Sequence, residues 1–236
     1  MQVAEQPWGF WATWAWMAVA LGLAVALALP AANWGIAWLF PTHPGRFVRD
    51  DLALTVGMLI AVAVLTFAAQ RAGWPAALYF GLTRPKTRYL VIGIAVVAVA
   101  QAAFFSLLFL TAKGIPAPAE SRLSPTAGLL AVLLPLFTAI LVGPVGEEVI
   151  FRGFLYRGLA ASQLGIGGAI AVTALVWTAS HYDRSWNYLV ASLAFGLILG
   201  WCRWRSNTTT LPIVLHAQWN FLFAALGIMA ETGWFK

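Results

Sequence analysis

Charged side chains are scarce in this sequence of 236 residues. Asp, Glu, Lys and Arg make up 9% of it and hydrophobic residues 61%, whereas a soluble domain carries about 25% charged residues. This composition excludes a water-soluble fold. The sequence has a single cysteine, Cys202, so no disulfide can form within the chain. The net charge of +6 comes from basic residues in short loops between apolar runs, which indicates contact with anionic lipid and no binding of nucleic acid.

Long uncharged runs fill most of the chain. They cover residues 6–45, 52–70, 89–112, 123–146, 158–182, 185–202 and 206–230. Each is long enough for a spanning helix, which needs about 20 residues, and none shows the alternating pattern of a membrane barrel. We therefore predict an all-α, polytopic transmembrane bundle of seven or eight helices, forming a single membrane-embedded domain over residues 1–236.

Two segments need separate treatment. Residues 72–83 are short and contain Gly73, Trp74 and Pro75, so we expect them to lie at the interface. In a signal peptide, basic residues precede the apolar stretch, and the first apolar run of this chain has none before it. We therefore expect this run to be retained as a helix.

Basic residues favour the loops after the second, fourth and sixth runs, which the positive-inside rule places in the cytoplasm. They are Arg71, Arg84, Lys86, Arg88, Arg157, Arg203 and Arg205. The prediction is an integral, multi-pass protein of the plasma (inner) membrane.

Ionisable groups inside apolar sequence are few, and each costs at least about 2.5–3.5 kcal/mol to insert, so each is a candidate for function. The acidic candidates are Glu147 and Glu148, and the histidine candidates are His181 and His216. His43 lies in a Pro- and Gly-containing loop and is expected to be ordinary.

The first motif contains two adjacent glutamates and an arginine. On a helix Glu148 and Arg152 share a face and can pair. Glu147 points about 100° away, because a helix turns once in 3.6 residues, and is left to take a proton from water. The alternative is that all three form one structural ion network.

Two further motifs contain histidine. His181 ends an apolar helix in the segment Trp177-Thr-Ala-Ser-His181, where it could also cap the helix C-terminus. His216 and Asn220 are four residues apart and face the same way. Such a pair could also simply hold helices together.

Together the three motifs resemble the CAAX-protease and bacteriocin-processing (CPBP, or Abi) family, whose marks are Glu-Glu-x-x-x-Arg, aromatic-x-x-x-His and His-x-x-x-Asn/Asp on successive membrane helices. The resemblance covers roughly residues 143–220, and the N-terminal half adds only compatible hydropathy. Trp177 stands where Phe is more usual in the family, which we expect to affect the shape of the pocket more than the chemistry.

The resemblance implies an intramembrane endopeptidase acting on a CAAX-type or other membrane-anchored protein or peptide in the lipid bilayer. In this interpretation Glu147, helped by His181, activates a water, and His216 and Asn220 stabilise the oxyanion. Glu148 and Arg152 then support the site by fixing their helix.

Three alternatives remain open at this point. A zinc enzyme would use Glu147, His181 and His216 as ligands, although we favour a mechanism without a cofactor. A non-catalytic scaffold or immunity protein would use the same polar groups for packing. A transporter would also carry midplane charges, but the sequence shows no paired halves.

The spacing of the motifs also predicts part of the geometry. A hairpin turn near Leu164 and Gly165 would bring Glu147 level with His181. If residues 185–202 cross the membrane fully, His216 begins its helix on the opposite side from His181. We therefore expect tilted helices, an incomplete crossing, or a bend at the Gly143-Pro144 step.

Overall fold

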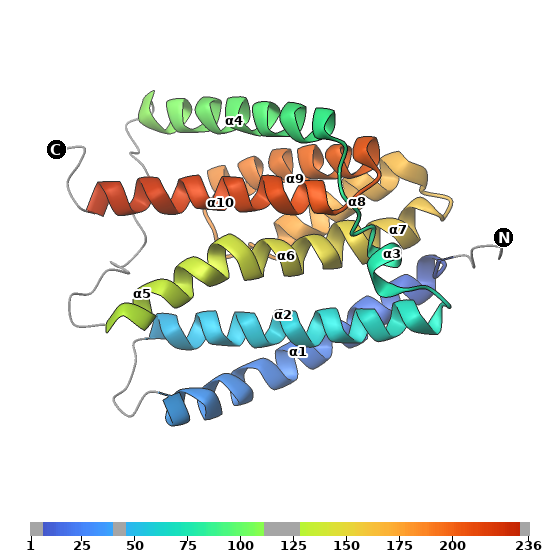
Figure 1. Cartoon of the computed structure of the whole chain (residues 1–236), viewed down its shortest axis with the longest axis horizontal. Helices are drawn as coiled ribbons and strands as arrows, with labels where there is room; N and C mark the ends of the chain where they lie inside the picture. Colours follow the sequence, from blue (N-terminus) through green and yellow to red (C-terminus); the bar gives the residue numbers. More distant parts are fainter. Residues whose placement is uncertain (1–6, 40–45, 111–127, 232–236) are drawn as a thin grey trace.

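The computed structural model describes residues 7–39, 46–110 and 128–231, and these residues form helices connected by short turns. His43 lies outside the described residues. Most of the long helices run along a common direction (Figure 1). They are α1 (Phe10–Leu39), α2 (Arg46–Arg71), α4 (Thr87–Leu110), α9 (Trp186–Ser206) and α10 (Thr210–Glu231). The predicted all-α bundle is confirmed.

One further long helix is irregular and carries the first motif. It is built without a break from α5 (Gly128–Phe137), η1 (Thr138–Val142), α6 (Gly143–Glu148), η2 (Val149–Leu155) and α7 (Tyr156–Ala160). The elements η1 and η2 are π-helical, a form that is common at functional sites. Pro144 has no N–H to donate, and the N–H of Gly143 reaches the carbonyl of Thr138 five residues back. A bend was expected at the Gly143-Pro144 step, and the structure has a π-helical turn directly before it.

Five of these helices are long and apolar enough to cross a membrane, counted over the described part of the chain. They cover Phe10–Gly35, Val48–Arg71, Thr87–Leu107, Leu133–Ala160 and Thr210–Met229. Many of their large apolar side chains are exposed on the outside of the bundle, as lipid-facing residues should be. The chain is an integral membrane protein.

The run at residues 158–182 differs from the single spanning helix that we predicted. Its first residues complete α7, the chain turns at Gly165, where φ is +61°, and α8 (Gly165–Ala179) follows. This helix has 15 residues and a length of about 22 Å, too short to cross the hydrocarbon core. The turn falls where the hairpin was predicted.

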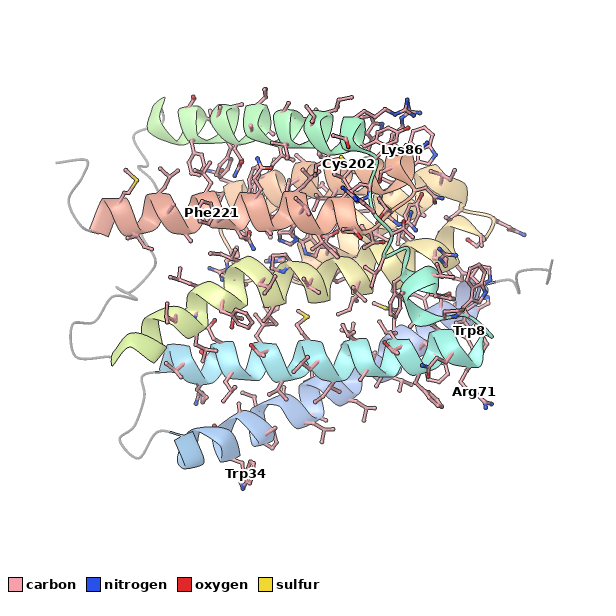
Figure 2. All side chains as sticks on the ribbon, viewed as in Figure 1. Trp8, Trp34, Arg71, Lys86, Cys202 and Phe221 are labelled. Atoms are coloured by element: carbon pink, nitrogen blue, oxygen red, sulfur yellow. The ribbon has the colours of Figure 1, made fainter. Side chains whose placement is uncertain are left out.

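The short segment before α4 forms no spanning helix, as predicted. It contains only the five-residue helix α3 (Ala76–Phe80), which ends at Gly81 with a φ of +70°. Figure 2 shows Arg71 and Lys86 at the same end of the bundle as this segment. Arg157 reaches it too, because its Nη2 donates to the carbonyl of Leu78 at 2.9 Å. Basic residues from two of the three predicted cytoplasmic loops therefore meet at one end.

Small residues let the helices approach closely around the irregular helix. A Cβ on Gly146 would lie 2.8 Å from the sulfur of Met58 on α2. A Cβ on Gly158 would collide with the side chain of Thr13 on α1. Close packing of this kind, with small residues at the contact, is typical of membrane helices, and it fixes the position of the first motif against α1 and α2.

Candidate active site

Glu148 and Arg152 form an ion pair in the interior of the bundle. Arg152 Nη1 donates to Glu148 Oε1 at 2.9 Å, and both side chains are 0% exposed. Arg152 Nη2 donates to the carbonyl of Gly196 on α9 at 3.1 Å. The pair predicted from the four-residue spacing is confirmed, and it also ties the irregular helix to α9.

His216 forms its hydrogen bond with Glu148 of this pair and not with Glu147. Its Nδ1 lies 2.9 Å from Glu148 Oε1, and the imidazole is buried. Since a carboxylate only accepts, Nδ1 carries the proton and donates. Glu148 thus connects the irregular helix to α10, a contact between residues 68 positions apart that the motif spacing did not indicate.

Glu147 forms no ion pair with Arg152 among the described residues, as predicted, but it does have a hydrogen-bond partner. The indole Nε1–H of Trp177 on α8 donates to Glu147 Oε2 at 2.5 Å. The carboxylate is half-buried, and Trp177 is 3% exposed. Trp177 thus makes a polar contact in addition to the effect on the shape of the pocket that we expected.

The ring of His181 turns back along α8. Its Nδ1 lies 2.9 Å from the carbonyl oxygen of Trp177, and the two rings are 5.1 Å apart between centroids. A carbonyl oxygen only accepts, so Nδ1 is protonated, and in the neutral ring Nε2 is left as a proton acceptor. This hydrogen bond gives His181 the tautomer that a general base needs.

Asn220 lies one turn after His216 on α10. Its Nδ2 donates to the carbonyl of Ala139 in η1 at 2.7 Å. The amide has two hydrogens on that nitrogen, and this bond uses one of them. The π-helical turn therefore holds Asn220 in place and leaves it a second hydrogen to donate.

These side chains share one cavity of about 70 Å³, which exceeds the roughly 10–15 Å³ needed for a water molecule. Its polar lining comes from Glu147, His181, Tyr188, Ser192, His216 and Asn220. Its apolar lining is mostly aromatic and comes from Phe104, Trp177, Ala191, Phe195, Trp219 and Phe223. The four side chains that the three motifs single out for chemistry therefore meet around space for water.

His216 reaches this cavity although α9 separates it from His181 in the chain. It lies six residues after the start of α10, about 9 Å along the helix. There it is level with Trp177, with 5.4 Å between the ring centroids. His181 sits one turn beyond Trp177 and its ring leans back. Both histidine rings contact Trp177, and this common neighbour brings them to one cavity.

The zinc alternative would need Glu147, His181 and His216 to hold one ion. No group of three or more His, Cys, Asp or Glu side chains within the described ranges is arranged to hold an ion. Trp177 occupies one oxygen of Glu147, and each histidine has its Nδ1 in a hydrogen bond. The Nε2 atoms of both rings remain, and histidines held in this way also serve as metal ligands in other proteins.

Tyr188 and Ser192 were missed as lining residues. They lie four residues apart near the start of α9, so they share one face of that helix. Polar residues at this spacing in an apolar helix were a usable signal. Neither residue belongs to the three motifs, and for that reason sequence reasoning passed over them.

The fold and the cavity define a helical membrane protein with a polar site among its helices. Residues 128–222 match the family model described as Rce1-like, type II CAAX prenyl endopeptidase Rce1-like. This match confirms the resemblance to the CPBP family and includes all three motifs. In general terms, it indicates a CAAX-type intramembrane protease that acts on a membrane-anchored substrate.

Two relatives are similar over larger parts of the chain. An uncharacterized 24.3 kDa protein of Escherichia coli is 28% identical over 207 residues, covering 79% of this chain and 88% of the relative. The UPF0177 protein YxdF of Lactococcus lactis subsp. lactis (strain IL1403) is 22% identical over 117 residues, covering 50% of this chain and 63% of the relative. Neither name states an activity. No solved structure matches the chain significantly.

Proposed function

We propose that this protein is a glutamate-dependent intramembrane endopeptidase. It hydrolyses a peptide bond near the membrane in a CAAX-type or other membrane-anchored substrate of the plasma membrane. The observation that carries the proposal is the cavity that Glu147, His181, His216 and Asn220 share. Separate helices bring these groups together around space for water, which supports hydrolysis better than packing alone.

Glu147 and His181 activate the attacking water. Trp177 occupies Oε2 of Glu147, so among the described residues Oε1 is the oxygen without a hydrogen bond, and it takes the proton of the attacking water. The neutral Nε2 of His181 accepts from the same water. The water oxygen bonds to the scissile carbonyl carbon, and the carbonyl oxygen becomes an oxyanion. When the C–N bond breaks, the proton held by Glu147 passes to the leaving amine.

His216 and Asn220 stabilise the oxyanion by donating hydrogen bonds to it. Asn220 donates its second amide hydrogen. His216 can donate from Nε2 only as an imidazolium, because its Nδ1 is already protonated towards Glu148. The Glu148 carboxylate, of opposite charge to that cation, lies 2.9 Å from the ring. The buried Glu148 and Arg152 therefore support the chemistry as well as the fold.

The test is cleavage of a membrane-anchored peptide by the purified protein in lipid. One substrate carries a prenylated C-terminal cysteine motif and a second has the same peptide on a transmembrane anchor. Glu147→Gln should lower kcat by about 100-fold or more while the protein stays folded. The matched control is Asp50→Asn, because Asp50 is an exposed carboxylate paired with Arg49 at the start of α2.

The outcomes separate the remaining alternatives. Cleavage that survives a strong chelator supports the cofactor-free mechanism, and cleavage lost on chelation and restored by zinc contradicts it. Full activity in Glu147→Gln would refute the glutamate mechanism. A scaffold or immunity protein would keep its cellular activity in that variant, so a phenotype assay run in parallel identifies this case.

A further inference from the structure

We propose that Trp177 is a positioning residue whose indole N–H holds the Glu147 carboxylate in its reactive orientation. This inference rests on the proposed function and deepens it. It assigns a role in catalysis to a side chain that the histidine motif contains only as an aromatic position.

The hydrogen bond is placed to orient Glu147. Trp177 Nε1 donates to Oε2 at 2.5 Å, and a hydrogen bond to a charged acceptor is stronger than one between neutral groups. A carboxylate on a flexible side chain has several rotamers. Binding one oxygen fixes the plane of the group and turns the other oxygen towards the cavity.

The donor itself is held rigidly from several sides. The guanidinium of Arg152 lies 5.0 Å from the centroid of the indole ring. The ring of His216 packs edge-on at 5.4 Å, and that of Phe195 lies at 6.1 Å. Because the indole is almost fully buried, it cannot swing away from Glu147. A fixed donor is what a preorganised site requires.

Trp177 also fixes the orientation of the His181 ring. The backbone carbonyl of Trp177 accepts from His181 Nδ1 at 2.9 Å. One residue therefore holds both groups of the proposed base, the carboxylate through its side chain and the imidazole through its backbone. Only the first contact depends on the identity of the side chain, so a substitution removes it and leaves the backbone contact in place.

The kinetic experiment is Trp177→Phe, which keeps an aromatic ring and removes the N–H. The matched control is Trp16→Phe, since Trp16 packs against Trp8 and Phe67 and does not line the cavity. We expect kcat of Trp177→Phe to fall by about 10- to 100-fold, as for the loss of a hydrogen bond to a charged group. Its KM should stay within about twofold of the wild-type value, because the bond does not hold substrate. The control should match the wild type in both constants.

A spectroscopic measurement tests the bond itself, independently of activity. In protein labelled with ¹⁵N at the tryptophan indoles, one N–H proton should lie far downfield and be missing in Trp177→Phe. It should move upfield in Glu147→Gln, because a neutral amide is a weaker acceptor than a carboxylate. If Trp177→Phe does not fold, the spectra of the wild type and Glu147→Gln still test the hydrogen bond. The resonance of a single indole N–H should differ between the two.

The results distinguish this inference from the proposed function. If Glu147→Gln keeps full activity, the proposed function fails. If Glu147→Gln is inactive but Trp177→Phe has normal kcat, the enzyme stands and the positioning role is overturned. An indole spectrum that is identical in wild type and Glu147→Gln overturns it as well, and so does a rise in KM with kcat unchanged.

Discussion

Removal of the Arg152 guanidinium should destabilise the whole bundle. In Arg152→Met the side chain keeps a similar length and loses its charge. The wild-type arginine is 0% exposed and donates to both Glu148 Oε1 and the Gly196 carbonyl. Its loss leaves a buried carboxylate with only His216 beside it. Breaking a buried ion pair in this way costs about 3–5 kcal/mol, a large fraction of the roughly 5–15 kcal/mol that holds a domain together.

The assay is the free energy of unfolding, measured by steric trapping in bicelles. The matched control is Arg184→Met, because Arg184 forms an exposed ion pair with Asp183 at 3.8 Å and should change stability by less than about 1 kcal/mol. The double variant Glu148→Gln with Arg152→Met should be less destabilised than the sum of the single variants, since it leaves no unpaired charge. The reasoning is refuted if Arg152→Met matches the control or if the two single effects simply add.

Two further predictions concern the oxyanion group and the helix packing. Asn220→Ala should lower kcat by about 100-fold because it removes an oxyanion donor, and the exposed Asn187→Ala on α9 is its control; equal kcat values would contradict the assignment. Gly158→Ala should lower the free energy of unfolding by about 1–3 kcal/mol through overpacking against Thr13. Gly167→Ala, which meets nothing within 4 Å on α8, should leave stability unchanged or raise it, and similar losses in both variants would exclude the contact as the cause.

The class of fold and the ion pair within the irregular helix were readable from the sequence. Long uncharged runs predict spanning helices because lipid offers no hydrogen bonds to an open backbone. The Glu148–Arg152 pair follows from the periodicity of a helix, which places residues four apart on one face. The choice of Glu148, and not Glu147, as the partner of Arg152 follows in the same way. All of these depend on distances along one helix or on composition.

The contacts between helices were decided by the tertiary structure alone. Periodicity could not show that His216 meets Glu148, or that the Trp177 indole meets Glu147, because these contacts depend on how far each helix is rotated and shifted against its neighbours. The turn at Gly165 was predicted, but the apolar composition of residues 158–182 did not show that α8 would be as short as 15 residues. Composition and local spacing fixed the kind of molecule, and the register of the packed helices decided which polar atoms face one another.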